Sequence, residues 1–336
     1  MKDLIPASSY LWIQITRDWN TWAIWIDQQV YIDNGLKRFE LLHANSTNTP
    51  LPAGIHLEKS EEPVALDTKT YYQQIIRTLV YATIGTRHNV TFAAMRLSRF
   101  NNHPMKEHIK FAKYVLWYLK ATKELKIKYD GSSDARLIGY SDSYWGENRD
   151  DCHSTSGHIF LMANGAISWA SQQQKTVELS VGEAEYMELA STGWQAAWLR
   201  SFSGEIGFSI GGPIPLCSDN QAAIFLTVNP AVKCQTKYIN IQHHYIWEQY
   251  ENKVVEPFHI AGVDNPADLF TKSLPVVKVE QFRSKIRIVQ FSGSVEMDSG
   301  EMYIFWLETE HSNKELYWII VQFIPVQMIL CWLMDW

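Results

Sequence analysis

The chain of 336 residues is 46% hydrophobic and 20% charged, with a formal net charge of −6. This composition excludes a largely disordered chain and leaves room for two or three folded domains. Because nucleic-acid binders usually carry a basic excess, local patches rather than the overall charge must hold any such partner.

Cysteine usage and the N-terminus bear on the cellular compartment. The four cysteines form no Cys-x-x-Cys pair and have no histidine at zinc-finger spacing, which is typical of reduced intracellular thiols. The N-terminus lacks the basic start and apolar run of a secretory signal. We therefore expect a cytoplasmic or nuclear protein.

The first 60 residues indicate a small piece of a larger unit. Strand-like apolar runs at 10–15 and 21–26 precede a helical pattern at 30–41. A cluster of Ser, Thr, Asn and Pro at 45–52 then predicts a loop.

Residues 70–119 show helical periodicity. Helices are predicted at 71–85, 90–100 and 104–121. The third helix places four lysines on one side, because steps of three, four and seven residues share a helix face. They are Lys106, Lys110, Lys113 and Lys120. Two interpretations are open, a solvated helix face and a surface that follows a phosphate backbone.

After residue 130 the pattern changes to strands. Apolar runs at 137–141, 157–161 and 166–170 predict three strands, the last two joined by a hairpin turn at Asn164-Gly165.

The following segments alternate helices with strands. Ser180 and Glu183 have capping-box spacing ahead of a helix at 181–202. A strand at 214–217, a short helix ending at Asn229-Pro230, an amphipathic stretch at 236–251, a strand at 254–260 and a last helix opening at Asn265-Pro266 complete the order. This β-β-β-α-β-α-α-β-α order predicts an α/β fold, with a mixed sheet flanked by helices.

Four acids form the candidate site. Asp142 and Asp219 each follow a predicted strand, Glu185 lies one turn into the long helix, and Asp268 lies in the first turn of the last helix. Strand-end carboxylates that converge favour a divalent cation, and hard oxygen ligands select magnesium or manganese. Each acid alone has an ordinary structural explanation, as a turn, surface or helix-start residue, so the combination carries the prediction.

Two metal ions about 3.5 to 4 Å apart can hold the attacking water and the leaving oxygen of a phosphodiester hydrolysis. No protein nucleophile is then needed. The sequence agrees with this, because it contains no Gly-x-Ser-x-Gly elbow and no phosphate-binding glycine loop.

Several motifs resemble the Pol polyprotein of copia-type LTR retrotransposons, and they occur in the family's order. In the nuclease region they are Tyr140-Ser-Asp-Ser-Tyr-Trp-Gly, Ser154-Thr-Ser-Gly-His-Ile-Phe, Gly165-Ala-Ile-Ser-Trp, Glu183-Ala-Glu-Tyr-Met, Cys217-Ser-Asp-Asn-Gln-Ala-Ala-Ile and Ala267-Asp-Leu-Phe-Thr-Lys-Ser-Leu. Upstream they are Thr70-Tyr-Tyr-Gln-Gln-Ile-Ile-Arg-Thr-Leu-Val-Tyr-Ala-Thr and Ala112-Lys-Tyr-Val-Leu-Trp-Tyr-Leu-Lys-Ala-Thr.

The resemblance implies a domain plan. Residues 1–60 would be a remnant of a reverse transcriptase palm or thumb, and residues 61–130 its mostly helical connection region. Residues 131–288 would be a ribonuclease H-like domain, and residues 289–336 an unrelated apolar tail.

The resemblance also implies an activity. The chain would be a metal-dependent endonuclease that cuts the RNA strand of RNA/DNA hybrids. Asp142, Glu185, Asp219 and Asp268 would bind two Mg²⁺ ions, with Mn²⁺ as a substitute, and Glu183 would be the fallback ligand. Other parts of the polyprotein would be partners, in a cytoplasmic virus-like particle or in the nucleus.

The chain departs from the family's pattern in three places. The Tyr/Phe-x-Asp-Asp motif of the polymerase is absent, so no DNA polymerisation is expected. The family's His-Ile-Asp-Ile is replaced by Tyr238-Ile-Asn-Ile, and Cys152-His153 replaces basic residues. The alternative is therefore a truncated, inactive remnant that at most binds nucleic acid.

Other residues leave two interpretations each. His243, His244 and His259 would be acid/base groups or structural residues, and Trp145, Trp169, Trp194 and Trp198 would be core residues or platforms for nucleotides. The apolar stretch 317–334 would be a membrane span or, as we expect, a terminal extension.

Overall fold

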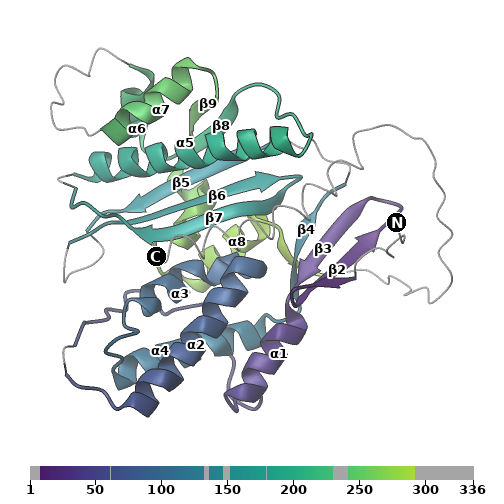
Figure 1. Ribbon diagram of the computed structural model, residues 1–336, viewed down its shortest axis with the longest axis vertical. Coiled ribbons are helices and arrows are strands. Elements are labelled where there is room, and N and C mark those ends of the chain that lie inside the picture. The colour runs from purple at the N-terminus through teal and green to yellow at the C-terminus, as the bar shows by residue number, and fades with distance from the viewer. Residues whose placement is uncertain are drawn as a thin grey trace.

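The computed structural model describes residues 8–60, 62–131, 136–146, 152–178, 180–229 and 241–291, without the side chains of residues 241–244. Within these residues the chain forms two five-stranded sheets with helices on either side of the second sheet (Figure 1). The segments 238–240 and 317–334, singled out from the sequence, lie outside the described residues.

The first sheet is antiparallel and has the order β1-β2-β3-β4-β10. Its strands are β1 (Ser9–Tyr10), β2 (Ile13–Asp18), β3 (Ala23–Asp27), β4 (Leu125–Tyr129) and β10 (Ile288–Gln290). The runs predicted at 10–15 and 21–26 correspond to β2 and β3, whereas β1, β4 and β10 were not predicted as separate strands. This sheet joins strands from the beginning, the middle and the end of the described chain.

Helices follow in the N-terminal half. They are α1 (Gln29–Arg38), α2 (Leu66–Gly85), the 3-10 turn η1 (His88–Val90), α3 (Thr91–Ser98) and α4 (Lys106–Ala121). The predicted helices are confirmed, although α2 begins five residues earlier than predicted. Three lysines of the predicted stripe on α4 have intramolecular contacts. Lys120 donates to the carbonyl of Ala44, and Lys113 and Lys110 lie 5.3 Å and 5.6 Å from the ring centres of Tyr71 and Phe111.

The second sheet is mixed, as predicted. Its strands are β5 (Ile138–Tyr144), β6 (Thr155–Met162), β7 (Gly165–Gln173), β8 (Ile214–Ser218) and β9 (Val255–His259), in the order β7-β6-β5-β8-β9. The strands β5, β6 and β7 are antiparallel neighbours, and β8 and β9 continue the sheet parallel to β5. A parallel extension of this kind needs helical crossovers between the strands.

The predicted hairpin between β6 and β7 is confirmed, with its turn one residue earlier. Ala163 and Asn164 have φ values of 49° and 63°, which is the backbone of a tight two-residue turn. Gly165 instead begins β7, where a Cβ would lie 2.3 Å from the ring of Tyr129. The Tyr129 hydroxyl donates to the carbonyl of Ala166 at 2.7 Å, so a β4 residue packs directly on the hairpin.

Helices complete the layers. One face of the second sheet carries α5 (Val181–Glu205). The helices α6 (Gln221–Val228) and α7 (Ile241–Glu251) pack against α5 (Figure 1). After β9 come the 3-10 turns η3 (Gly262–Asp264) and η4 (Pro266–Phe270), followed by α8 (Val276–Lys285). The predicted last helix at Asn265-Pro266 is therefore a short 3-10 helix, and the longer α8 after it was missed.

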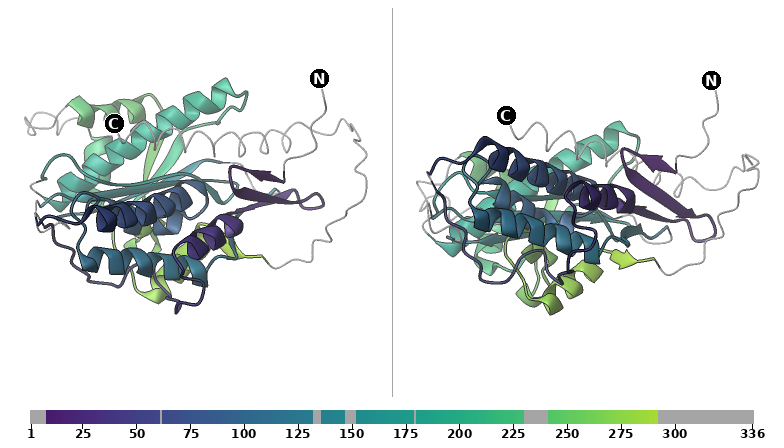
Figure 2. Two further views of the ribbon diagram at one scale, coloured as in Figure 1. Left: turned by 60° about the horizontal axis from the view of Figure 1, so that its bottom comes forward. Right: turned by 90° about the horizontal axis from the view of Figure 1, so that it is seen from below.

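The opposite face of the second sheet packs on the N-terminal helices (Figure 2). The indole of Trp169 on β7 donates to the carbonyl of Thr83 on α2 at 3.0 Å. The buried ring of His88 lies 4.8 Å from the Trp169 ring and 6.4 Å from the Phe270 ring, centre to centre. One continuous apolar core therefore runs through the helical layer and the sheet.

Among the described residues, no helix is long and apolar enough to cross a membrane.

Candidate metal centre

Three elements bring carboxylates to one end of the second sheet. Asp142 lies within β5, which continues to Tyr144, and not after the strand as the sequence suggested. Asp219 directly follows β8. The parallel register pairs Tyr140 with Cys217, so the two aspartates, each two residues further on, are neighbours. Glu185 reaches the same place from the second turn of α5.

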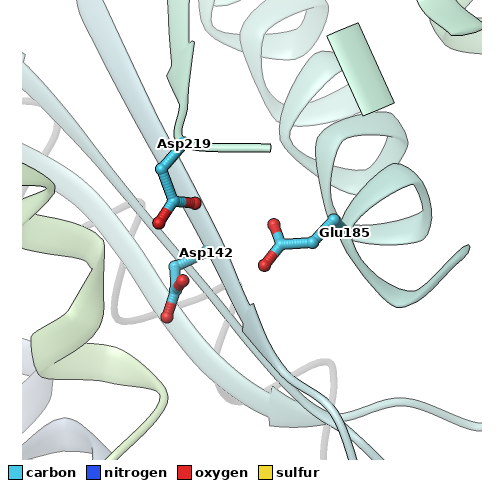
Figure 3. A group of neighbouring side chains, drawn as sticks. All are labelled: Asp142, Glu185 and Asp219. Carbon is cyan, nitrogen blue, oxygen red and sulfur yellow. The ribbon is translucent and has the colours of Figure 1, made fainter. Parts of the chain in front are cut away.

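The three side chains point toward a common position (Figure 3). One carboxylate oxygen from each lies within 4.8 Å of the others. Asp142 and Glu185 are buried, with relative exposures of 2% and 5%. The backbone N–H of Ser143 donates to Oε1 of Glu185 at 3.3 Å, whereas Oε2 is buried without a hydrogen-bond partner among the described residues. Glu185, and not Glu183, belongs to this group.

The fourth acid lies on the other side of Asp142. The ammonium of Lys272 is 2.7 Å from Oδ1 of Asp268 and 3.4 Å from Oδ2 of Asp142. The Thr271 hydroxyl donates to the same Oδ2 of Asp142. Asp142 therefore stands between a group of acids on one side and a lysine shared with Asp268 on the other.

Two residues hold η4, and with it Asp268, against the sheet. The buried side chain of Asn265 donates to the carbonyl of Ser141 at 2.8 Å and accepts from the N–H of Ala267 at 3.1 Å. Gly157 pairs with Asp142 across the β5–β6 ladder, and a Cβ there would lie 2.6 Å from the Cβ of Phe270. The close approach of η4 thus depends on a glycine.

Burial and mutual repulsion govern the electrostatics. Burial raises the pKa of Asp142 to about 7, against the opposing effect of Lys272. Burial, together with repulsion from Asp142, raises the pKa of Glu185 to about 9. The pKa of Asp268 is raised by burial as well. A cluster of carboxyl groups whose pKa values are raised by burial and mutual repulsion is stabilised by a bound cation.

The donor set fits a hard divalent ion. All the ligand atoms are carboxylate oxygens, which suit magnesium or manganese better than zinc. Asp142, Glu185 and Asp219 are placed to hold one ion together. Asp268 does not belong to this group, and it shares the ammonium of Lys272 with Asp142 instead.

The histidines and tryptophans singled out from the sequence differ in their position and exposure. His259 is exposed at the end of β9, where it pairs in register with Ser218, one residue before Asp219. The side chains of His243 and His244 are outside the described set. Trp169 is a core residue, whereas Trp145 and Trp194 are 46% and 50% exposed.

Sequence reasoning missed three residues of this centre. Lys272 and Thr271 follow Asp268 by four and three residues, and this helical spacing could have indicated the ion pair with Asp268. The contacts of Thr271 and Asn265 with β5 span 129 and 124 residues, and no local pattern shows them.

The strand order and the acids on β5, after β8 and on α5 define an α/β protein with a carboxylate cluster at one end of a mixed five-stranded sheet. No family model matches the chain. It is 35% identical over 285 residues to the retrovirus-related Pol polyprotein from transposon TNT 1-94 of Nicotiana tabacum, a match that covers 83% of this chain and 21% of that protein. Over about four fifths of its length the chain is a homologue of the retrovirus-related Pol polyproteins of copia-type transposons, as its motifs suggested.

Two further similarities complete the comparison. The Pol polyprotein from transposon RE1 of Arabidopsis thaliana is 32% identical over 265 residues, which cover 79% of this chain and 18% of that protein. The crystal structure of LC11-RNase H1 in complex with an RNA/DNA hybrid matches 40% of this chain and 94% of its own, with a TM-score of 0.29 and 14% identity. The chain spans about a fifth of the length of the Pol polyproteins that it matches.

Proposed function

We propose that this chain is a metal-dependent endonuclease that hydrolyses the RNA strand of RNA/DNA hybrids as part of a retrotransposon Pol polyprotein. The convergence of Asp142, Glu185 and Asp219 at one end of the mixed sheet carries the proposal. Asp268 is the proposed fourth ligand. No polymerase activity is proposed, because the chain has no Tyr/Phe-x-Asp-Asp motif.

When bound, two divalent ions would supply the activation of water and the stabilisation of the leaving oxygen. The chain's own residues orient the ligands. The Ser143 N–H fixes one oxygen of Glu185, and the Thr271 hydroxyl and the Lys272 ammonium fix one oxygen of Asp142. Preorganised ligands of this kind lower the cost of reaching the reactive geometry.

We also propose the domain plan that the resemblance to Pol polyproteins implied. Residues 131–288 would be the nuclease, and residues 1–130 the end and the connection of a reverse transcriptase. The similarity to Pol polyproteins supports hybrid nucleic acid as substrate, other Pol segments as partners, and a virus-like particle or the nucleus as location.

The test is cleavage of a labelled RNA/DNA hybrid by the full chain. We expect cutting of the RNA strand in Mg²⁺ and none in EDTA. Asp219→Asn should lower the rate by about two orders of magnitude or more, because metal coordination contributes several kcal/mol to the transition state. Asp67→Asn, an exposed acid at the start of α2, is the matched control.

Two outcomes would contradict the proposal. Equal cleavage rates for Asp219→Asn and the parent chain would contradict the assignment of these carboxylates as the catalytic metal centre. Hybrid binding without cleavage in Mg²⁺ would favour the alternative, an inactive remnant that only binds nucleic acid.

A further inference from the structure

A pocket of about 250 Å³ adjoins the metal centre and is lined by residues from both halves of the chain. His56 and Arg96 come from the loop before α2 and from α3, and Tyr144 and Lys272 come from the end of β5 and the segment after η4. The carboxylates of the metal centre and the side chains that support them all come from Asp142 onward. The pocket therefore places N-terminal side chains next to the carboxylates.

The pocket is close to the position of the reaction. Tyr144 follows Asp142 by two residues on β5, so both side chains lie on the same face of that strand. The ammonium of Lys272 lies 3.4 Å from Asp142 Oδ2 and 5.9 Å from the ring centre of Tyr144. A strand whose phosphate lay at the carboxylates would have a neighbouring phosphate within reach of this pocket.

The lining of the pocket suits an anion. Arg96 and Lys272 contribute positive charge, and none of the described residues that line the pocket is acidic. The guanidinium of Arg96 is fixed, because Nη2 donates to the carbonyl of Ile55 at 3.1 Å and the group lies 5.7 Å from the ring centre of Phe92. Ser273 Oγ, also in the lining, is buried without a hydrogen-bond partner among the described residues.

We propose that this pocket binds a backbone phosphate of the nucleic-acid strand next to the phosphate that is attacked. The inference rests on the proposed function and adds a substrate subsite to it. Arg96 and His56 make the N-terminal half part of that subsite. A fixed guanidinium is a strong ligand for phosphate, because its planar N–H groups match two phosphate oxygens. The local charge also explains how a chain with net charge −6 can hold a polyanion.

The test is the salt dependence of hybrid binding by the full chain, measured by fluorescence anisotropy without divalent ions. Arg96→Gln should weaken binding about fivefold and lower the slope of log K against log salt by about 0.7 to 0.9, the contribution of one phosphate contact. Arg96→Lys should keep most of the slope. Arg77→Gln, at an exposed position on α2, removes the same charge elsewhere and should change neither quantity.

His56→Ala provides a variant that cannot disturb the core, because His56 is exposed. It should weaken binding about threefold, the value of one hydrogen bond. Unchanged affinity and slope in both Arg96→Gln and His56→Ala would contradict phosphate binding in this pocket, even if Mg²⁺-dependent cleavage supported the proposed function. If Arg96→Gln lowers the slope but the parent chain does not cut the hybrid, the phosphate subsite is supported and the proposed nuclease activity is contradicted. No hybrid binding by the parent chain would contradict both the phosphate subsite and the proposed nuclease function.

Discussion

Gly157 shows how one missing side chain shapes the centre. It lies opposite Asp142, and Phe270 of η4 and the following Thr271 pack directly on it. Gly157→Ala should push η4 and Asp268 away from the sheet. We expect a loss of about 1–3 kcal/mol of unfolding free energy, the usual cost of overpacking, and a lower cleavage rate.

Urea unfolding and hybrid cleavage measure the two effects. Gly182→Ala on α5 is the control, since a Cβ there meets nothing within 4 Å. Helix propensity predicts that this control is stabilised by about 0.5–1 kcal/mol. A Gly157→Ala variant as stable and as active as the parent would contradict the role given to this glycine.

Lys272 is a tethered cation between Asp142 and Asp268. Lys272→Gln should destabilise the protein in EDTA, because the buried Asp142 and the partly buried Asp268 then repel each other without compensation. The same change should tighten Mn²⁺ binding about tenfold, since a competing positive charge worth about 1.4 kcal/mol is gone. Isothermal titration with Mn²⁺ and thermal unfolding in EDTA measure both.

Lys285→Gln is the control, because Lys285 forms an exposed ion pair with Asp264 at 2.5 Å. Exposed pairs contribute about 1 kcal/mol or less. If Mn²⁺ affinity is the same in Lys272→Gln and in the parent, Lys272 does not compete with the metal.

The raised pKa values predict the pH dependence of stability. A carboxyl group whose pKa is higher in the folded than in the unfolded chain stabilises the fold only while it is protonated. That contribution is complete below the ordinary carboxyl pKa of about 4 and is lost as the pH rises. The loss extends through about 7 for Asp142 and about 9 for Glu185.

In EDTA the thermal midpoint should therefore fall between pH 5 and pH 9. Mg²⁺ should raise the midpoint most at the upper end of this range, where the acids are charged. Glu185→Gln should flatten the part of the curve above pH 7. A metal-free midpoint that rises over this range would show that the acids are not strained by burial.

Local sequence information indicated the four acids but not their supports. Asp142 and Asp219 could be indicated because each stands near a strand end, and Glu185 because it lies one turn into the long helix that leans over the same end of the sheet. Asn265 could not be assigned its role, because its partner Ser141 is 124 residues away. Spacing along the chain carries no information on such a contact.

At the scale of elements, periodicity located most helices and strands and missed β4, β10 and α8. β4 has the alternating sequence Leu125-Lys-Ile-Lys-Tyr129, which is a strand pattern. It was missed because it begins only four residues after the end of the long helix α4. β10 has three residues and is a strand only because it pairs with β4. Short strands depend on their partners more than on their own residues.

The contact between β7 and α2 has its own test. Trp169 is buried at 6% exposure and donates to Thr83, so Trp169→Ala should cost about 3–5 kcal/mol of unfolding free energy. Trp194→Ala on α5 is the matched control at 50% exposure and should cost about 0.5 kcal/mol or less. Urea unfolding of both variants decides the point, and similar losses would contradict the assigned core contact.

At the scale of the whole molecule, the two halves share one core and one sheet. A segment of residues 131–291 alone would expose Trp169 and Phe270, which the N-terminal helices cover in the full chain. We expect this segment to aggregate or to give poorly dispersed spectra, whereas the full chain unfolds in one transition. A well-folded, monomeric segment would contradict this view of a shared core.

The pairing of β10 with β4 also has a kinetic consequence. Ile288 lies opposite Ile127, so the first sheet cannot be completed until nearly all the described chain has left the ribosome. Contacts of such long sequence separation form slowly. In the interval the edge of β4 is open to other chains, which makes the nascent protein prone to aggregation and a client for chaperones.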